Sequence, residues 1–348
     1  MIHKSRSVNR DINLPSTKIT KQLLITEYLK NFHFWILGEL SDNFNQMIQS
    51  IINRFIISVT KLLPLSFVRL IAGRYVAGEK QLDALQIVGE LNNKGYSATI
   101  DILGEHSKTS DTAQAATEQY INLYKAIKVK NLDCNISIKP THLGLDMGMK
   151  CVQDNVLSLL KTAEETDNFL RIDMENSTIT NDTITLYYKC KEHYSDVGTV
   201  LQAYLYRSEN DLKILSQDRN FNFRLCKGIY RENADIAIQG RHKINANFIS
   251  LLRYAFDNNI YVGIATHDLY ILETAYELIT TLTIPSDRFE FQVLYGVPMS
   301  GWLQKHLQKG YKVRVYVPFG DDWYDYSLRR LKENPNIARY VFKNMFRR

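Results

Sequence analysis

Hydrophobic and polar positions follow different patterns in two parts of the chain. From about Gln22 to Asn93 the apolar residues recur at helical spacing, without the alternation expected of strands. After Gly95, short strand-like segments alternate with longer segments of helical periodicity as far as the end of the chain. The pattern predicts an N-terminal arm and helical subdomain over residues 1–94, followed by a catalytic or binding domain over residues 95–348.

Eight segments of the second part are predicted strands, and most are followed by a predicted helix. Repetition of strand and then helix indicates parallel strands joined by right-handed crossovers, and eight such units in about 250 residues fit a closed (β/α)8 TIM-type barrel. A doubly wound open sheet is the alternative, but no G-x-G-x-x-G or G-x-x-x-x-G-K-[ST] loop occurs. The predicted strands are Ser97–Leu103, Asn135–Lys139, Phe169–Met174, Val200–Tyr206, Phe223–Lys227, Tyr261–Ala265, Phe289–Leu294 and Val313–Val317. The predicted helices between them are Asp111–Ile127, Gly148–Glu165, Asp182–His193, Asn245–Asp257, Leu269–Thr280 and Gly301–Lys309.

Composition narrows the class of protein. With 348 residues and 45% hydrophobic content, the chain can bury a large core. The net charge of +6 is dispersed, unlike the aromatic-interleaved basic block of a nucleic-acid binder, and leaves contact with anionic lipid or an acidic ligand open. The four cysteines lie far apart without a C-x-x-C pair, so we expect a reducing compartment, no disulfides and no zinc or other metal site.

The N-terminal region does not read as a membrane span. Its most hydrophobic stretch, residues 32–72, is interrupted by charged residues, and no apolar run reaches the roughly 18 residues that a span requires. The first residues also lack the apolar core of a signal peptide. We expect a cytoplasmic protein that can lie peripherally at the inner face of the membrane.

Polar residues at the ends of the predicted strands indicate a ligand site. Active residues of such barrels lie at the carboxyl ends of the strands, and an apolar barrel interior needs no charges there. An unpaired buried charge costs several kcal/mol, so charges on five strands favour a polar site at the barrel mouth, although Asp173 or Glu290 alone also fits a structural ion pair. The residues concerned are Asp101, Glu105, Lys139, Asp173, Glu175, Gln202, Arg224, Lys227, Tyr230, Thr266, His267, Glu290, Gln292 and Tyr316.

A helix is predicted directly after the last strand. Tyr326, Arg329, Arg330 and Glu333 are spaced by three, four and seven, so they share one broad face. Two adjacent guanidinium groups can bind a carboxylate, each charge-assisted bond contributing about 1.5–3 kcal/mol. A salt-bridged surface helix is the alternative interpretation.

Several short motifs in this part of the chain resemble those of proline dehydrogenases. The resemblance covers roughly residue 98 to the C-terminus, in the order of the family. It implies a distorted barrel that binds FAD and oxidises L-proline to 1-pyrroline-5-carboxylate, the first step of proline catabolism. Because the chain ends soon after the last motif, a monofunctional enzyme is expected. The motifs are Ser137-Ile-Lys-Pro-Thr-His-Leu-Gly144, Arg171-Ile-Asp-Met-Glu-Asn-Ser177, Arg224-Leu-Cys-Lys-Gly-Ile-Tyr-Arg231, Ala265-Thr-His-Asp268, Phe289-Glu-Phe-Gln292 and the terminal Tyr-x-x-Arg-Arg-x-x-Glu.

The resemblance also implies roles for residues around the substrate. Lys139, Arg329 and Arg330 would bind the carboxylate of proline. Glu105 would pair with Arg329 to close a gate over the substrate, and Asp173 and Glu175 would orient Lys139. The wall of the pocket would consist of Tyr326, Tyr316, Leu225, Tyr230 and Asp101.

For the cofactor, the resemblance implies that Arg224 lies near N5 of the flavin and Gln202 at the edge of the isoalloxazine. Lys227 and Gly228 would meet the phosphates. Hydride would pass from C5 of proline to N5, and a quinone would then take the electrons. Pro140, Ile229 and Cys226 depart from the usual residues of the family, and Pro140 would be the one to displace the strand end that carries Lys139. The full set of cofactor positions is Gln202, Arg224, Lys227, Gly228, Tyr230, Thr266, His267, Gln292 and Arg330.

Two other functions fit parts of the pattern. Lys139 and Lys227 lie at strand ends, where barrel aldolases carry a Schiff-base lysine. That function leaves the arginine pair unexplained. A barrel that binds a proline-like ligand without a flavin and without catalysis is the third possibility.

Overall fold

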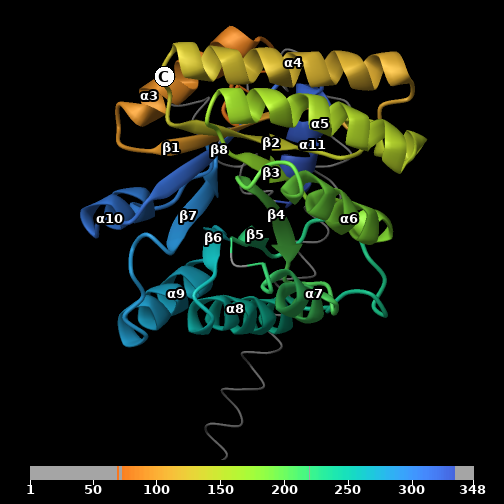
Figure 1. Ribbon diagram of the computed structural model, residues 1–348. Helices are drawn as coiled ribbons and strands as arrows, with labels where there is room; N and C mark the ends of the chain where they lie inside the picture. Colours follow the sequence, from red (N-terminus) through yellow and green to blue (C-terminus); the bar gives the residue numbers. More distant parts are fainter. Residues whose placement is uncertain (1–68, 70–72, 219, 334–348) are drawn as a thin grey trace, which may run out of the picture.

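The computed structural model describes residue 69, residues 73–218 and residues 220–333, and the side chains of residues 329–333 lie outside this description. Eight parallel strands pair in sequence order, and the last pairs with the first, so the sheet closes. Figure 1 shows the strands as a ring with helices around it. The predicted (β/α)8 barrel is confirmed, because an open sheet would leave its first and last strands unpaired.

Most element boundaries agree with the prediction to within a few residues. The strands are β1 (Ser97–Ile102), β2 (Cys134–Ile138), β3 (Leu170–Ile172), β4 (Val197–Gln202), β5 (Asn222–Cys226), β6 (Tyr261–Ala265), β7 (Phe289–Leu294) and β8 (Val313–Phe319). The helices are α3 (Gln81–Asn92), α4 (Ser110–Val129), α5 (Met149–Glu165), α6 (Thr180–Lys191), α7 (Ser208–Leu215), α8 (Arg241–Asp257), α9 (Leu269–Thr281), α10 (Trp302–Gln308) and α11 (Trp323–Glu333), with short 3-10 helices at Leu145–Met147 and Ser177–Ile179.

The fourth strand was predicted wrongly. It lies about three residues earlier than Val200–Tyr206, and residues 203–206 turn into α7, a helix that the pattern did not reveal. Tyr204 and Tyr206 have high strand propensity, but the N–H of Leu205 donates to the carbonyl of Gln202 (3.1 Å), which closes a turn. Local hydrogen bonding therefore prevails over propensity here.

The hydrophobic core lies between the strands and the helices. Ile100, Ile136, Phe223 and Phe291 face outward and are fully buried in this layer. Successive strand residues point to opposite faces, so the intervening residues line the interior of the barrel. That interior is polar, with buried side chains that include Asp101, Ser137, Arg171, Arg224, Glu290 and Arg314. Apolar packing outside the ring thus holds the fold and leaves the interior for charged groups.

Two helices depart from the regular barrel. Helix α3 packs against β1 and β8, where the helix after the eighth strand lies in a regular barrel. Helix α11 follows β8 and buries Trp323, Tyr326 and Ser327. The rest of the predicted N-terminal subdomain, residues 1–68 and 70–72, lies outside the described residues, and the division at residues 94 and 95 stays a prediction. Among the described helices, none is both long and apolar enough to cross a bilayer.

Candidate active site

A buried ion pair joins the carboxyl ends of β1 and β2. Nζ of Lys139 donates to Oδ2 of Asp101 at 2.5 Å. Burial raises the pKa of Asp101 above its usual value, and Lys139 offsets only part of this effect. Burial lowers the pKa of Lys139, but Asp101 and Asp173 more than compensate and leave it raised. Lys139 is therefore held as a cation inside the barrel mouth.

Asp173 is the centre of a second polar cluster. Its Oδ1 accepts from the hydroxyl of Ser137 (2.5 Å) and from Nη1 of Arg224 (2.7 Å), and its Oδ2 accepts from the hydroxyl of Tyr316 (3.0 Å). Nε of Arg224 donates to Oε1 of Gln292 at 2.6 Å, and its guanidinium lies over the ring of Tyr316. Asp173, just after β3, and side chains on β2, β7 and β8 thus fix the orientation of the Arg224 guanidinium on β5.

Gln202, at the end of β4, carries a polar atom that needs a partner. The residue is 2% exposed, and its Nε2 donates to the carbonyl of Met174 (3.3 Å). Its Oε1 is buried and accepts no hydrogen bond within the described part of the chain. Leaving such an acceptor unpaired costs about 1–3 kcal/mol. A bound ring with an N–H donor, as the isoalloxazine of a flavin has, would satisfy it.

A third cluster lies after β5 and β6. Oδ2 of Asp268 accepts from Nζ of Lys227 and, at 3.0 Å each, from Nη2 of Arg241 and Nδ2 of Asn245. Burial alone would raise the pKa of Asp268, but these donors lower it to about 2. Lys227 and Arg241 keep part of their side chains exposed, so the cluster presents positive charge that suits a phosphate.

Most of the predicted site residues lie at this one end of the barrel. The buried or half-buried ones at strand ends are Lys139, Asp173, Gln202, Arg224, Thr266, Gln292 and Tyr316, and Glu105, Lys227, Gly228, Tyr230 and His267 follow in the loops. Tyr326 on α11 is buried, and it lies close enough to Tyr316 to add to the effect of burial, which raises the pKa of Tyr316. Nε2 of His267 accepts from the N–H of Leu294 (3.0 Å), which fixes the imidazole.

Comparison with known proteins shows the family of this chain. The sequence model of the family described as Proline dehydrogenase matches residues 84–341. This chain belongs to the proline dehydrogenase family. It is 36% identical to proline dehydrogenase 1 of Bacillus subtilis subsp. natto over 292 residues, which cover 84% of this chain and 96% of that protein. It is 33% identical to the proline dehydrogenase of Deinococcus radiodurans, over 80% of this chain and 90% of that protein. Proline utilization A from Bdellovibrio bacteriovorus has the same fold, with a TM-score of 0.71 over 76% of this chain and 32% of that one at 24% identity.

The terminal motif of the family is described only in part. Arg329 and Arg330 lie on α11, but their side chains are outside the described structure. Their carboxylate clamp and the gate between Glu105 and Arg329 therefore stay predictions.

Three expectations drawn from the family resemblance differ from the observed geometry. Leu225 is fully buried in the layer that faces the helices, because it alternates with the inward-facing Arg224, so it does not wall a pocket inside the barrel. Asp173 and Glu175 do not accept a hydrogen bond from Lys139, whose acceptor is Asp101. Glu175 instead accepts from the N–H (3.0 Å) and hydroxyl (2.6 Å) of Thr141.

Gly228, a predicted cofactor residue, and Pro140, one of the departures from the family, each have a structural explanation. Gly228 has φ +106°, and a Cβ there would collide with the ring of Tyr204, so glycine is required before any cofactor is considered. The carbonyl of Pro140 accepts from the N–H of Leu145 (3.0 Å) in a tight turn. This turn leaves Lys139 in contact with Asp101.

Sequence reasoning gave no role to four residues of these clusters. Ser137 and Asp268 lie within quoted family motifs but were assigned no contact. Arg241 and Asn245 begin α8, four residues apart, and lie more than ten residues after Lys227. The signal that they share one face of the helix was present, but their common acceptor was not visible in the sequence.

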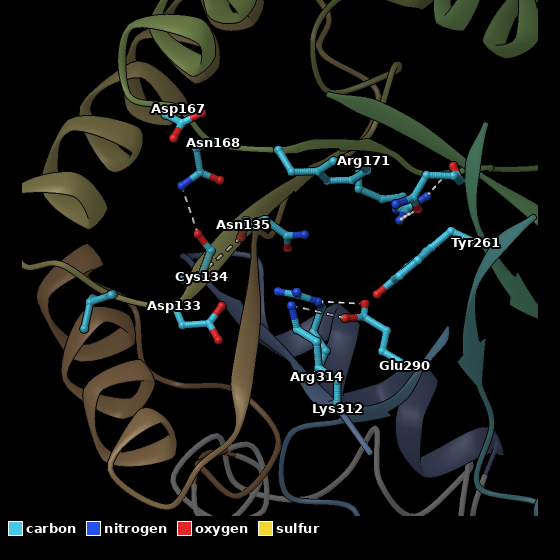
Figure 2. A pocket seen from close by; sticks show the side chains of 13 residues that line it. Asp133, Cys134, Asn135, Asp167, Asn168, Arg171, Tyr261, Glu290, Lys312 and Arg314 are labelled. Atoms are coloured by element: carbon cyan, nitrogen blue, oxygen red, sulfur yellow. Dashed lines mark hydrogen bonds and ion pairs between the residues drawn. The ribbon is translucent and has the colours of Figure 1, made fainter. Parts of the chain in front are cut away.

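A separate cavity of about 340 Å³ lies at the opposite, amino end of the barrel. Figure 2 shows Glu290, Arg314 and Tyr261 pointing toward one another in it. Nε of Arg314 donates to Oε1 of Glu290 at 2.8 Å, and burial, which would raise the pKa of Glu290, is outweighed by Arg314, which lowers it to about 2. Glu290, predicted either as part of the ligand site or as a structural pair, is thus an ion-paired residue at the other end.

Proposed function

We propose that this member of the proline dehydrogenase family oxidises L-proline to 1-pyrroline-5-carboxylate with bound FAD. The observation that carries the proposal is the buried Lys139 and Asp101 pair next to the oriented guanidinium of Arg224. A small zwitterion needs a fixed cation for its carboxylate and an acceptor for its amine, in a place protected from water. This end of the barrel offers both.

Different side chains at the carboxyl end of the barrel would bind different parts of the substrate. Lys139 binds the carboxylate of proline together with Arg329 and Arg330. The rings of Tyr316, Tyr326 and Tyr230 enclose the pyrrolidine. Glu105 pairs with Arg329 over the bound substrate and excludes water.

The cofactor would be held by the strand ends on the other side of the pocket. When bound, FAD supplies the acceptor for the hydride that leaves C5 of proline. Gln202 and Arg224 would hold its ring, with Arg224 kept in place by Asp173 and Gln292. Lys227 and Gly228 would meet its phosphates. The remaining contacts are Tyr230, Thr266, His267, Gln292 and Arg330.

A quinone is the proposed electron acceptor. No motif for a nicotinamide cofactor occurs in the sequence. The net charge of +6 would favour contact with an anionic membrane surface, where a quinone can be reached. Reduction of a soluble short-chain quinone by proline, dependent on the enzyme, tests this part by itself.

The aldolase alternative is disfavoured by the state of its lysines. A Schiff base forms from a neutral amine, whereas the raised pKa of Lys139 keeps it charged beside Asp101. Lys227 donates to Asp268.

An anaerobic absorbance spectrum before and after addition of L-proline tests the proposed function. We expect flavin bands that bleach with L-proline and persist with D-proline. Flavin bands that do not bleach would reject L-proline as the substrate. Protein that stays colourless after FAD is supplied would reject FAD as the cofactor.

A further inference from the structure

Most buried carboxylates that the structure describes at the barrel mouth have both oxygens in hydrogen bonds. Both carboxylate oxygens of Asp173, Glu175 and Asp268 accept from donors of the described chain. Asp101 differs from them. Its Oδ2 accepts from Lys139, while its Oδ1 is buried and accepts no hydrogen bond among the described residues. The carboxylate is 1% exposed, so water does not readily satisfy this oxygen.

Two hydroxyl groups near Asp101 are committed elsewhere. The hydroxyl of Tyr120 donates to the carbonyl of Ile102 at 3.4 Å, and that of Tyr316 donates to Oδ2 of Asp173 at 3.0 Å. A tyrosine has only one O–H to donate. Within the part of the chain that the structure describes, Oδ1 of Asp101 therefore remains without a hydrogen bond and can accept one from a proton donor of the substrate.

The chemistry of proline brings such a donor to this place. Its secondary ammonium carries two N–H groups, and the nitrogen is bonded to the carbon that carries the carboxylate. A cation that binds the carboxylate and an acceptor for the amine must consequently be neighbours. Lys139 and Asp101 are neighbours in an ion pair, at 2.5 Å.

We propose that Asp101 is the catalytic base that takes the proton from the substrate ammonium, an inference that rests on the proposed function. The N–H bond breaks, an O–H bond forms on Oδ1, and the electron pair stays on nitrogen. This pair can then form the C=N bond as C5 loses its hydride, for which bound FAD would supply the acceptor. Lys139 remains a cation and continues to hold the carboxylate.

Electrostatics of the site agree with this role. Among the described side chains, the charged or titratable groups that face Asp101 are Lys139, Asp173, Tyr120 and Tyr316. Burial raises the pKa of Asp101, and Asp173 adds to the effect, so the carboxylate accepts a proton more readily than an exposed aspartate.

The variant Asp101→Asn and the ring-oxygen isostere of proline, tetrahydrofuran-2-carboxylate, test the proposal together. The isostere keeps the carboxylate but has no N–H to give. We expect kcat/KM for proline to fall about 100-fold or more, as for loss of a general base, and the inhibition constant of the isostere to change less than about threefold. Asp133→Asn, the same change at the amino end of the barrel, should leave both values as they are.

If binding of proline and of the isostere is weakened equally in Asp101→Asn, Asp101 only positions Lys139. If kcat/KM is unchanged, Asp101 has no role in the reaction. Either result overturns the proposal.

The unmodified enzyme gives a second measurement should the variant not fold. On acidification through the ionisation of Asp101, kcat/KM for proline should fall while the inhibition constant of the isostere should not rise, and parallel changes would contradict the proposal. Failure of the unmodified enzyme to oxidise proline would instead reject the proposed function.

Discussion

At the scale of single residues, the pair of Lys139 and Asp101 has a positional rather than a stabilising value. Taking two charges out of water costs several kcal/mol, and their attraction in the interior returns about as much. The hydrogen bond at 2.5 Å nevertheless fixes where the ammonium lies. We therefore expect Lys139 to contribute little to the stability of the fold and more to binding of the substrate carboxylate.

Replacement of Lys139 should therefore appear mainly in substrate affinity. For Lys139→Met we expect the KM for L-proline to rise roughly 10- to 150-fold, which corresponds to loss of one charge-assisted hydrogen bond of about 1.5–3 kcal/mol. Steady-state kinetics with a dye acceptor measure this. Lys150→Met, the same change at an exposed position of α5, serves as the control, and an unchanged KM in Lys139→Met would contradict the assigned role.

At the scale of elements, one side chain connects three neighbouring strands. Arg171 on the short strand β3 donates from Nη1 to the carbonyls of Thr199 (2.7 Å) and Asn222 (2.9 Å), which belong to β4 and β5. Gly198 leaves the space for this guanidinium, since a Cβ there would collide with it and with the carbonyl of Asn222. The absence of a side chain at Gly198 thus allows Arg171 to connect the three strands.

Gly198→Ala should destabilise the barrel by about 1–3 kcal/mol, the usual cost of overpacking, through displacement of Arg171. Gly89→Ala in helix α3 is the matched control. Its new Cβ would meet only Leu132 at 3.9 Å, and alanine favours a helix by about 0.5–1 kcal/mol over glycine. Urea unfolding of both variants measures the difference, and equal stability of the two would contradict this account.

At the scale of the whole molecule, buried titratable groups make stability depend on pH. His306 lies on α10, is fully buried, and stacks on Phe291 of β7 with 3.8 Å between ring centroids. Burial, with a smaller effect of Lys305, lowers its pKa to about 4. The unfolded chain, with a histidine pKa near 6.5, therefore binds more protons than the folded one between these values. Stability should fall as pH decreases from 6.5 to 4.

The contribution of His306 to this fall should be about 3 kcal/mol. We expect His306→Gln to lose that part of the slope of the free energy of unfolding between pH 7 and pH 4, whatever its stability at pH 7. His242→Gln, at an exposed position, should keep the slope of the unmodified protein. Identical slopes in all three proteins would show that His306 is not the group responsible.

The sequence alone determined the order of elements and the kind of chemistry. Seven of the eight strands follow from local periodicity, and charges at strand ends indicate a polar site because a buried charge needs a partner. Both are properties of neighbours in the chain. The family motifs indicated L-proline as the substrate, but they did not indicate which side chains contact one another.

Only the tertiary structure decided which side chains meet. Lys139 finds Asp101 from 38 positions away, and Arg224 meets Gln292 across 68. Arg171 on β3 meets carbonyl groups of β4 and β5, and the inward or outward direction of Leu225 follows from the register of the sheet. Such pairings depend on barrel closure, which brings distant strand ends to one rim, and periodicity within a segment carries no information about its distant partner.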